Sequence, residues 1–214
     1  MRVLLLGATG AAGGALLDAA LADGRVSEVR VITRRPLPER SPKLQVVQLE
    51  DFDRLADVAA SFAGIDACFY CIGRATTQVP DDAEYRHLAV DLPLSAATLL
   101  HEHSPKAVFH YLSGRGAAAD SRQRWARAKH AAEQQLRGQF GAVCWRPGAI
   151  DARRQGGWPW HYRVFIPMLR WLPALQSYYV SGADLAHAML VAAMAGSRDR
   201  IYENREIRQL AQRK

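Results

Sequence analysis

Three glycines near the amino terminus have the spacing of a phosphate-binding turn. Gly7, Gly10 and Gly13 lie between an apolar run at residues 3–6 and an alanine- and leucine-rich stretch at residues 11–21. In the order strand, turn, helix, one glycine permits the turn, one lets a diphosphate approach the main chain, and one lets helix and strand pack closely. The helix start adds free N–H groups and a positive dipole end. The alternative is an ordinary strand-to-helix turn. We assign the phosphates to Gly7, Thr9, Gly10, Ala11, Ala12 and Gly13.

Two arginines follow the second predicted strand, residues 28–33. An acidic residue at this point would bind the ribose hydroxyls of adenosine, whereas arginine favours a 2′-phosphate. The chain has Thr33, Arg34 and Arg35 here. These residues predict NADP rather than NAD as the cofactor, unless both arginines are only loop charges. Asp51, after a third strand at residues 44–49, either contacts the adenine or, like Asp53, caps the next helix.

The elements that would position these residues alternate between strand and helix. Further strands are predicted at residues 67–72, 107–112, 142–145 and 201–203, and helices at residues 83–103, 123–137, 164–172 and 181–195, with Pro93 kinking or dividing the first of these. This order predicts an α/β fold with a doubly wound parallel sheet and ligands at the carboxyl ends of the strands. We expect one domain, residues 1–214, with residues 149–180 as an irregular substrate-side region.

The composition is that of a soluble globular protein, and we expect it to be cytoplasmic. It is 49% hydrophobic and 23% charged, and no stretch reaches transmembrane length, so no membrane contact is predicted. The net charge is +7, but the arginines are scattered, so nucleic-acid binding is a minor alternative. Cys68 and Cys71 form a C-x-x-C inside a predicted strand, where residues three apart face opposite sides. We therefore predict neither a disulfide nor a metal site there.

Five segments together resemble the atypical short-chain dehydrogenase/reductases of the NAD(P)-binding Rossmann superfamily. They are GATGAAG at residues 7–13, CIG at 71–73, YLSGRGA at 111–117, WARAKHAAEQQL at 125–136 and RPG at 146–148. Within that superfamily the chain is similar to the Tat-interacting-protein-related small oxidoreductases and to epimerase-like bacterial proteins. The resemblance implies the fold and the cofactor but not the substrate.

The resemblance also implies roles for single residues. In such enzymes a serine holds the substrate oxygen, a tyrosine transfers a proton, and a lysine lowers the pKa of that tyrosine and binds the nicotinamide ribose. Ser113 and Lys129 match the serine and the lysine, but Trp125 stands in place of the tyrosine. An indole N–H can donate a hydrogen bond but is not a usable general acid or base. The backbone of Cys71, Ile72 and Gly73 would line the riboses, and Pro147 would wall the nicotinamide pocket.

Three functions remain open at this point. The first is a reductase of an unidentified small molecule whose proton comes from Tyr111, Tyr85 or water. The second is a non-catalytic NADP(H) sensor with a protein partner or a second copy of the chain. The third is a scaffold without a cofactor. Trp125 would either fill space left by lost catalysis or stack on a substrate. Ser113 and Lys129 could instead be a turn cap and a solvated helix charge.

Overall fold

Seven parallel strands form one sheet in the order β3-β2-β1-β4-β5-β6-β9. The computed structural model describes residues 1–74, 78–79, 81–150 and 178–212. The strands are β1 (Arg2–Leu6), β2 (Glu28–Thr33), β3 (Leu44–Gln48), β4 (Ala67–Tyr70), β5 (Val108–Leu112), β6 (Val143–Arg146) and β9 (Arg200–Glu203). The strand order reverses between β1 and β4, and such a switch point is where doubly wound sheets bind ligands. The predicted Rossmann-type fold is confirmed.

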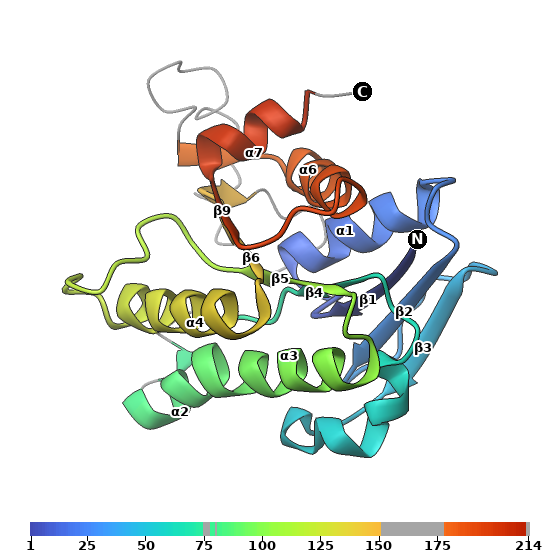
Figure 1. Ribbon diagram of the computed structural model, residues 1–214, viewed down its shortest axis with the longest axis horizontal. Coiled ribbons are helices and arrows are strands. Elements are labelled where there is room, and N and C mark those ends of the chain that lie inside the picture. Colours follow the sequence, from blue (N-terminus) through green and yellow to red (C-terminus); the bar gives the residue numbers. More distant parts are fainter. Residues whose placement is uncertain (75–77, 80, 151–177, 213–214) are drawn as a thin grey trace.

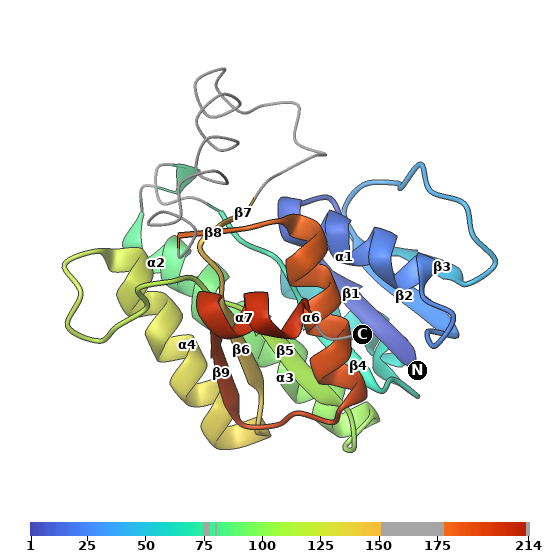
Figure 2. The same ribbon diagram turned by 90° about the horizontal axis from the view of Figure 1, so that it is seen from above.

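Helices cover both faces of the sheet (Figure 1). One face carries α1 (Ala11–Ala22), α6 (Gly182–Met194) and α7 (Asn204–Leu210), and the other carries α3 (Leu92–His103) and α4 (Arg124–Phe140). The short helix α2 (Asp82–Arg86) and the 3₁₀ segment η1 (Phe52–Phe62) lie on the side of α3 and α4. The view from above shows how these helices cross behind and in front of the strands (Figure 2). Strands buried on both faces explain the continuous apolar runs in the sequence.

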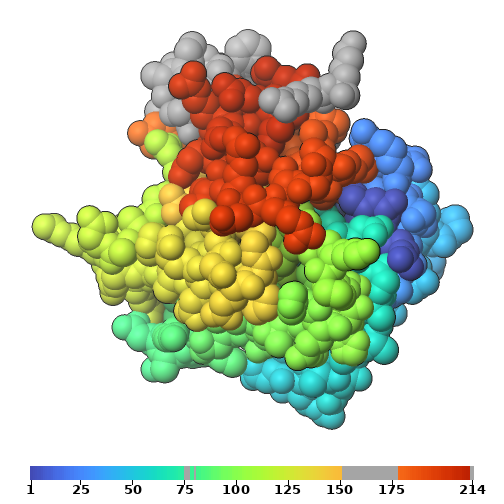
Figure 3. Space-filling model, viewed as in Figure 1, coloured from blue at the N-terminus to red at the C-terminus, as the bar shows by residue number. Residues whose placement is uncertain are grey.

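Alternate residues of each central strand enter two separate cores. Val3 and Leu5 pack with α1 and α6, whereas Leu4 and Leu6 pack with α3 and α4. Cys71 belongs to the first core and Cys68 to the second, and all three cysteines are free. The prediction that Cys68 and Cys71 face opposite sides is therefore confirmed. The space-filling view shows N-terminal residues (blue) beside the C-terminal part of the chain (red) on one face (Figure 3).

The predicted helix at residues 83–103 is divided ahead of Pro93. A π-helical turn, η3 (His87–Asp91), separates α2 from α3, and Pro93 stands at the start of α3. Because proline has no N–H, Pro93 cannot donate to the carbonyl of Ala89, four residues earlier, as an α-helical residue would. The interruption therefore falls one turn before the proline.

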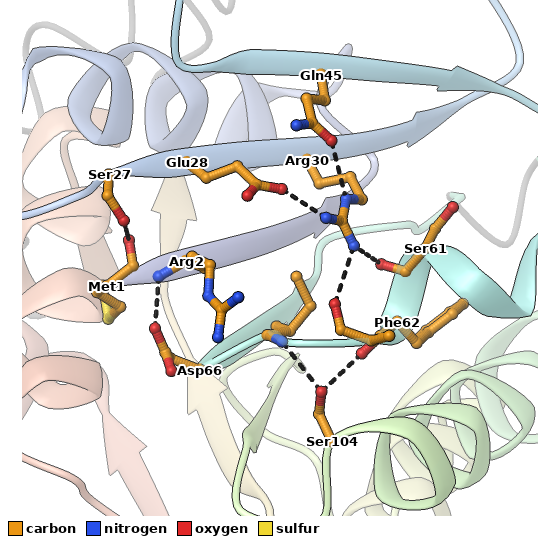
Figure 4. Close-up of polar contacts among 12 residues, drawn as sticks. Met1, Arg2, Ser27, Glu28, Arg30, Gln45, Ser61, Phe62, Asp66 and Ser104 are labelled. Carbon is orange, nitrogen blue, oxygen red and sulfur yellow. Dashed lines mark hydrogen bonds and ion pairs between the residues drawn. The ribbon is translucent and has the colours of Figure 1, made fainter.

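The end of η1 is held to the sheet by polar contacts (Figure 4). The guanidinium of Arg30 on β2 donates to the carbonyls of Ser61 at 2.7 Å and Ala63 at 3.1 Å. The hydroxyl of Ser104, after α3, donates to the carbonyl of Phe62 at 2.8 Å. These contacts fix the end of η1 near the amino end of β4. The start of η1, at Phe52, lies at the carboxyl ends of the strands.

Two elements were not predicted from the sequence. A second, two-stranded parallel sheet pairs β7 (Ala149–Ile150) with β8 (Tyr179–Val180). Helix α7 begins with a capping box between Glu203 and Glu206, but glutamate is not one of the usual N-cap residues, so the sequence does not signal this start. Most of the predicted region 149–180, including its helix at residues 164–172, lies outside the described residues. No helix in the part of the chain that the structure describes is long and apolar enough to cross a membrane.

Candidate functional site

The glycine turn after β1 has three different steric requirements. Gly7 has φ +91°, and a Cβ there would lie 2.6 Å from the carbonyl carbon of Cys71. A Cβ on Gly13 would lie 2.1 Å from the carbonyl oxygen of Gly7, so helix and strand touch at this point. Gly10 has room for a Cβ, 3.4 Å from its nearest neighbour, and it opens α1 without a side-chain cap. The turn therefore leaves a bare helix N-terminus, which suits a diphosphate.

A cavity of about 190 Å³ opens at the carboxyl edge of the sheet. It spans the distance from the end of β2 to α4, and it brings together five of the predicted site residues: Arg34, Asp51, Ile72, Gly73 and Lys129. Arg35 is exposed and is not among the described residues that line the cavity. Sequence reasoning did not assign His87 or Arg74, which also line it.

Lys129 lies at the α4 end of this cavity. Its ammonium donates a 2.9 Å hydrogen bond to the carbonyl of Leu112, the last residue of β5, and lies 4.5 Å from the ring centre of Tyr111. Burial lowers the pKa of Lys129 to about 8, although the nearby carboxylate of Glu133 acts in the opposite direction. The ammonium is therefore charged at neutral pH and held at the end of β5.

Ser113 directly follows the carbonyl that Lys129 binds. Its N–H donates to the carbonyl of Trp145 at 2.8 Å, and the residue is only 8% exposed. Its Oγ is buried and has no hydrogen-bond partner among the described residues. A buried hydroxyl without a partner calls for one from a ligand or water. The structure thus brings Ser113 and Lys129 to the same strand end.

Trp125 packs against the turn that follows Ser113. Its indole N–H donates to Oε1 of Gln123 at 2.8 Å. A Cβ on Gly114 would lie 3.3 Å from the indole, and one on Gly116 would lie 3.8 Å from it. Both glycines therefore make room for the large ring. Trp125 fills space beside Ser113, one helical turn before Lys129.

The structure removes Tyr111 from the candidate proton sources. Its hydroxyl is fully buried and donates at 2.7 Å to the carbonyl of Ala89, to which Pro93 cannot donate. Burial raises the pKa of Tyr111 well above its usual value. Tyr85, in contrast, lines the cavity, and the guanidinium of Arg124 lies 5.3 Å from its ring centre. Burial raises the pKa of Tyr85, while Arg124 lowers it.

The end of the cavity nearest to β2 contains both signs of charge. The hydroxyl of Thr33 donates to the carbonyl of Arg35 at 3.0 Å, which forms the turn that carries Arg34 to the cavity. Asp51 accepts a 2.9 Å hydrogen bond from the N–H of Asp53, so it caps η1 and also lines the cavity. The capping role of Asp51 is therefore confirmed, and its contact with the adenine stays a prediction.

A histidine on η3 pairs across the cavity rim with η1. Nε2 of His87 lies 2.5 Å from Oδ1 of Asp53, and this contact raises the pKa of His87. The two residues are 34 positions apart in the chain. No local sequence pattern indicates such a pair.

Pro147 follows β6 near the same edge. It is buried, and its carbonyl accepts a 3.0 Å hydrogen bond from the N–H of Arg115. Pro147 is not among the described residues that line the cavity. It therefore joins the turn after Ser113 to the end of β6.

A family model and several relatives match this chain. The NAD dependent epimerase/dehydratase family model matches residues 3–141. Protein HTATIP2 of Rattus norvegicus is 31% identical over 173 residues, which cover 78% of this chain and 71% of that protein. Leucinostatins biosynthesis cluster protein T of Purpureocillium lilacinum is 31% identical over 119 residues, 54% of this chain. The matched part spans only 44% of the Purpureocillium protein.

Several solved structures share the fold of this chain. UDP-glucose 4-epimerase from Thermotoga maritima, solved with UDP-glucose, has a TM-score of 0.71 at 17% identity over 95% of this chain and 76% of that chain. The Bordetella bronchiseptica enzyme WbmF, solved with NAD⁺, has a TM-score of 0.71 at 17% identity over 98% of this chain and 76% of that chain. At such identities the likeness concerns the fold. Together with the family match, it shows that this chain belongs to the NAD-dependent epimerase/dehydratase family and is an atypical short-chain dehydrogenase/reductase with an NAD(P)-binding Rossmann fold.

Proposed function

We propose that this protein is an NADP(H)-dependent oxidoreductase of the atypical short-chain type with an altered proton relay. The observation that carries the proposal is the 2.9 Å hydrogen bond from Lys129 to the carbonyl of Leu112, directly before Ser113, at the same edge of the sheet as the glycine turn. Trp125, in the tyrosine position, is the reason for an altered relay.

The chain offers a fitting group for each part of the cofactor. Gly7, Gly10 and Gly13, with Thr9, Ala11 and Ala12, would hold the diphosphate against the bare start of α1. The backbone of residues 71–73 would face the riboses, because Ile72 and Gly73 line the cavity. The thiol of Cys71 is buried, which raises its pKa to about 12, so this side chain would take no part in the chemistry. When bound, the nicotinamide would supply hydride transfer.

NADP is favoured over NAD by the charge at the end of β2. No carboxylate stands at positions 33–35, and Arg34 lines the cavity. A guanidinium can bind a phosphate through paired hydrogen bonds. Asp53 also lines the cavity, but its charge is partnered by His87 at 2.5 Å. Arg34 would therefore meet the 2′-phosphate, with Arg35 beside it in the turn.

The proton would reach the substrate by a route other than the usual tyrosine. The free Oγ of Ser113 would hold the substrate oxygen, and the ammonium of Lys129 would bind the nicotinamide ribose. The indole of Trp125 cannot deliver a proton, and the hydroxyl of Tyr111 is already hydrogen-bonded to the carbonyl of Ala89. Tyr85 or a water molecule in the cavity would serve as the donor.

Trp125 also supports a second candidate, a non-catalytic NADP(H) sensor. A protein that keeps the lysine and the glycine turn but lacks the phenol retains the means to bind the cofactor while losing proton transfer. Such a protein would report the redox state of the cofactor to a partner.

Titration calorimetry with NADPH and NADH, followed by NADPH oxidation with aldehyde, quinone and flavin acceptors, tests both candidates. Tighter binding of NADPH than of NADH, together with turnover, supports the oxidoreductase. Selective binding without turnover supports the sensor. Absence of binding to either nucleotide rejects both.

A further inference from the structure

A buried carboxylate lies one helical turn beyond Lys129. Glu133 is 0% exposed, and residues four apart on a helix lie on the same face. Its two oxygens accept hydrogen bonds from Nε of Arg146 at 2.9 Å and from Nη2 of Arg146 at 2.6 Å. The third nitrogen of Arg146 binds Glu203 at 2.9 Å. Arg146, at the end of β6, therefore occupies both oxygens of Glu133.

Lys129 and Glu133 have the spacing of an intrahelical ion pair, yet they do not form one. Lysine and glutamate four residues apart on a helix commonly attract each other. Here the ammonium of Lys129 instead donates to the carbonyl of Leu112 and lines the cavity. The two side chains remain close enough for the carboxylate to raise the pKa of Lys129. Because Arg146 binds Glu133, the ammonium of Lys129 remains at the cavity.

We propose that Arg146 is a positioning residue that occupies Glu133 and so directs the ammonium of Lys129 towards the cofactor cavity rather than into an ion pair within α4. This inference rests on the proposed role of Lys129 in cofactor binding. Arg146 itself would touch neither cofactor nor substrate, and it would act through Glu133 and Lys129.

Without Arg146, the buried carboxylate of Glu133 would need another cation as its partner. A buried carboxylate without a partner is strongly unfavourable, so neighbouring cations compete for it. On its own helix Glu133 is flanked by Lys129 and Arg137 at four-residue spacing. Arg137 pairs through Nη2 with the exposed Asp199 at 2.9 Å, and its buried Nε has no partner among the described residues. Lys129 has only a neutral carbonyl as its present acceptor, and Glu133 already raises its pKa, so we expect Lys129 to move; a pKa of Lys129 that does not change would show that Arg137 moves instead.

Four variants separate this role from simple structural support. They are Arg146→Met, Glu133→Gln, the double variant carrying both changes, and Arg146→Lys, which keeps a positive charge if the methionine variant fails to fold. Two quantities are measured in each: the dissociation constant for NADPH by calorimetry, and the pKa of Lys129 in the cofactor-free protein by NMR of carbon-13-labelled lysine. The lysines are few, at positions 43, 106, 129 and 214, so the Lys129 signal can be assigned with Lys129→Arg.

The expected result is a loss in the single arginine variant and a recovery in the double variant. Arg146→Met should weaken NADPH binding by about tenfold, the value of one hydrogen bond from a charged group, and should raise the pKa of Lys129. Arg146→Lys should shift both quantities less and in the same direction. Adding Glu133→Gln to Arg146→Met should restore NADPH binding to within about threefold and lower the pKa of Lys129 again.

Two results would overturn the inference. One is a double variant that binds NADPH as weakly as Arg146→Met, and the other is a Lys129 pKa that stays the same in every folded arginine variant. Failure of the wild-type protein to bind any dinucleotide would reject the proposed function instead. The NMR titration needs no cofactor and would still decide whether Arg146 keeps Glu133 away from Lys129.

Discussion

The hydroxyl of Tyr111 donates a 2.7 Å hydrogen bond to the carbonyl of Ala89. Pro93, four residues after Ala89, cannot supply the helical N–H, so a phenol from the neighbouring strand takes its place. The same bond buries the tyrosine nearest to Ser113 in the chain and keeps it from any ligand. With Trp125 in the family's tyrosine position, neither aromatic side chain beside Lys129 can serve as a proton donor.

Restoring a phenol at position 125 should increase turnover. Trp125→Tyr would place a hydroxyl one helical turn before Lys129, where the ammonium can lower its pKa. A positioned general acid contributes about 10²–10⁴-fold, so NADPH oxidation with a panel of carbonyl compounds should rise by at least about tenfold. Trp125→Phe, which removes the indole without adding a hydroxyl, is the matched control. An active wild type with no gain in the tyrosine variant would refute the altered relay.

Cofactor affinity should depend on the charge of Lys129. Because burial lowers the pKa of Lys129 to about 8, the ammonium loses its proton as the pH rises through that value. NADPH binding, followed by calorimetry, should weaken over the same range, and Lys129→Met should remove this dependence. Lys106→Met, at an exposed position away from the cavity, should keep it. A wild-type affinity that stays constant from neutral to alkaline pH would argue against the contact.

Arg34 should distinguish NADPH from NADH. Arg34→Ala removes the guanidinium that lines the cavity, and hydrogen bonds to a charged group are worth about 1.5–3 kcal/mol. NADPH should therefore bind about 10–100-fold more weakly, while NADH changes little. Arg35→Ala is the neighbouring control and should have a smaller effect. Equal losses for the two nucleotides would reject the assignment of the 2′-phosphate.

His110 should make the protein less stable in acid. It is fully buried between Phe69, at 4.6 Å between ring centres, and Trp145, whose N–H it accepts. Burial lowers the pKa of His110 from 6.5 to about 3. Between these values the unfolded chain binds a proton that the folded protein does not. His110 therefore does not reduce the free energy of unfolding above pH 6.5. Below pH 6.5 it reduces this free energy by up to about 1.4 kcal/mol per pH unit.

Urea unfolding at several pH values measures this effect. His110→Gln keeps a hydrogen-bond acceptor for Trp145 but cannot be protonated, so its free energy of unfolding should fall less steeply below pH 6.5. The exposed His103→Gln should retain the wild-type slope. Identical slopes in the wild type and in His110→Gln would show that His110 does not control acid stability.

The fold and the glycine turn after β1 were predictable from local patterns. The apolar run before Gly7 and the glycine spacing predict the first strand, turn and helix, because each glycine has a steric reason within a few residues of chain. Lys129 and Ser113 came from the family resemblance, and the structure brings both to the end of β5. The predicted order of strands and helices needed only their alternation along the chain.

The remaining features depend on contacts between distant segments. The pairing of His87 with Asp53 joins residues 34 positions apart, and the bond from Tyr111 to Ala89 spans 22. Arg146 appears in the sequence only as part of an RPG segment, and nothing nearby indicates that it binds Glu133. Such pairs follow from how helices pack on the sheet, which periodicity does not specify.

The most direct test of the account is NADPH calorimetry on Gly10→Asp. A Cβ fits at Gly10, and aspartate is a favourable helix N-cap, so the thermal midpoint should not fall. The new carboxylate would occupy the helix start and repel the diphosphate, weakening NADPH binding by about a hundredfold or more. Gly24→Asp, in open space after α1, should bind as the wild type does. A Gly10→Asp protein with wild-type affinity for NADPH would contradict the phosphate-binding role of the glycine turn.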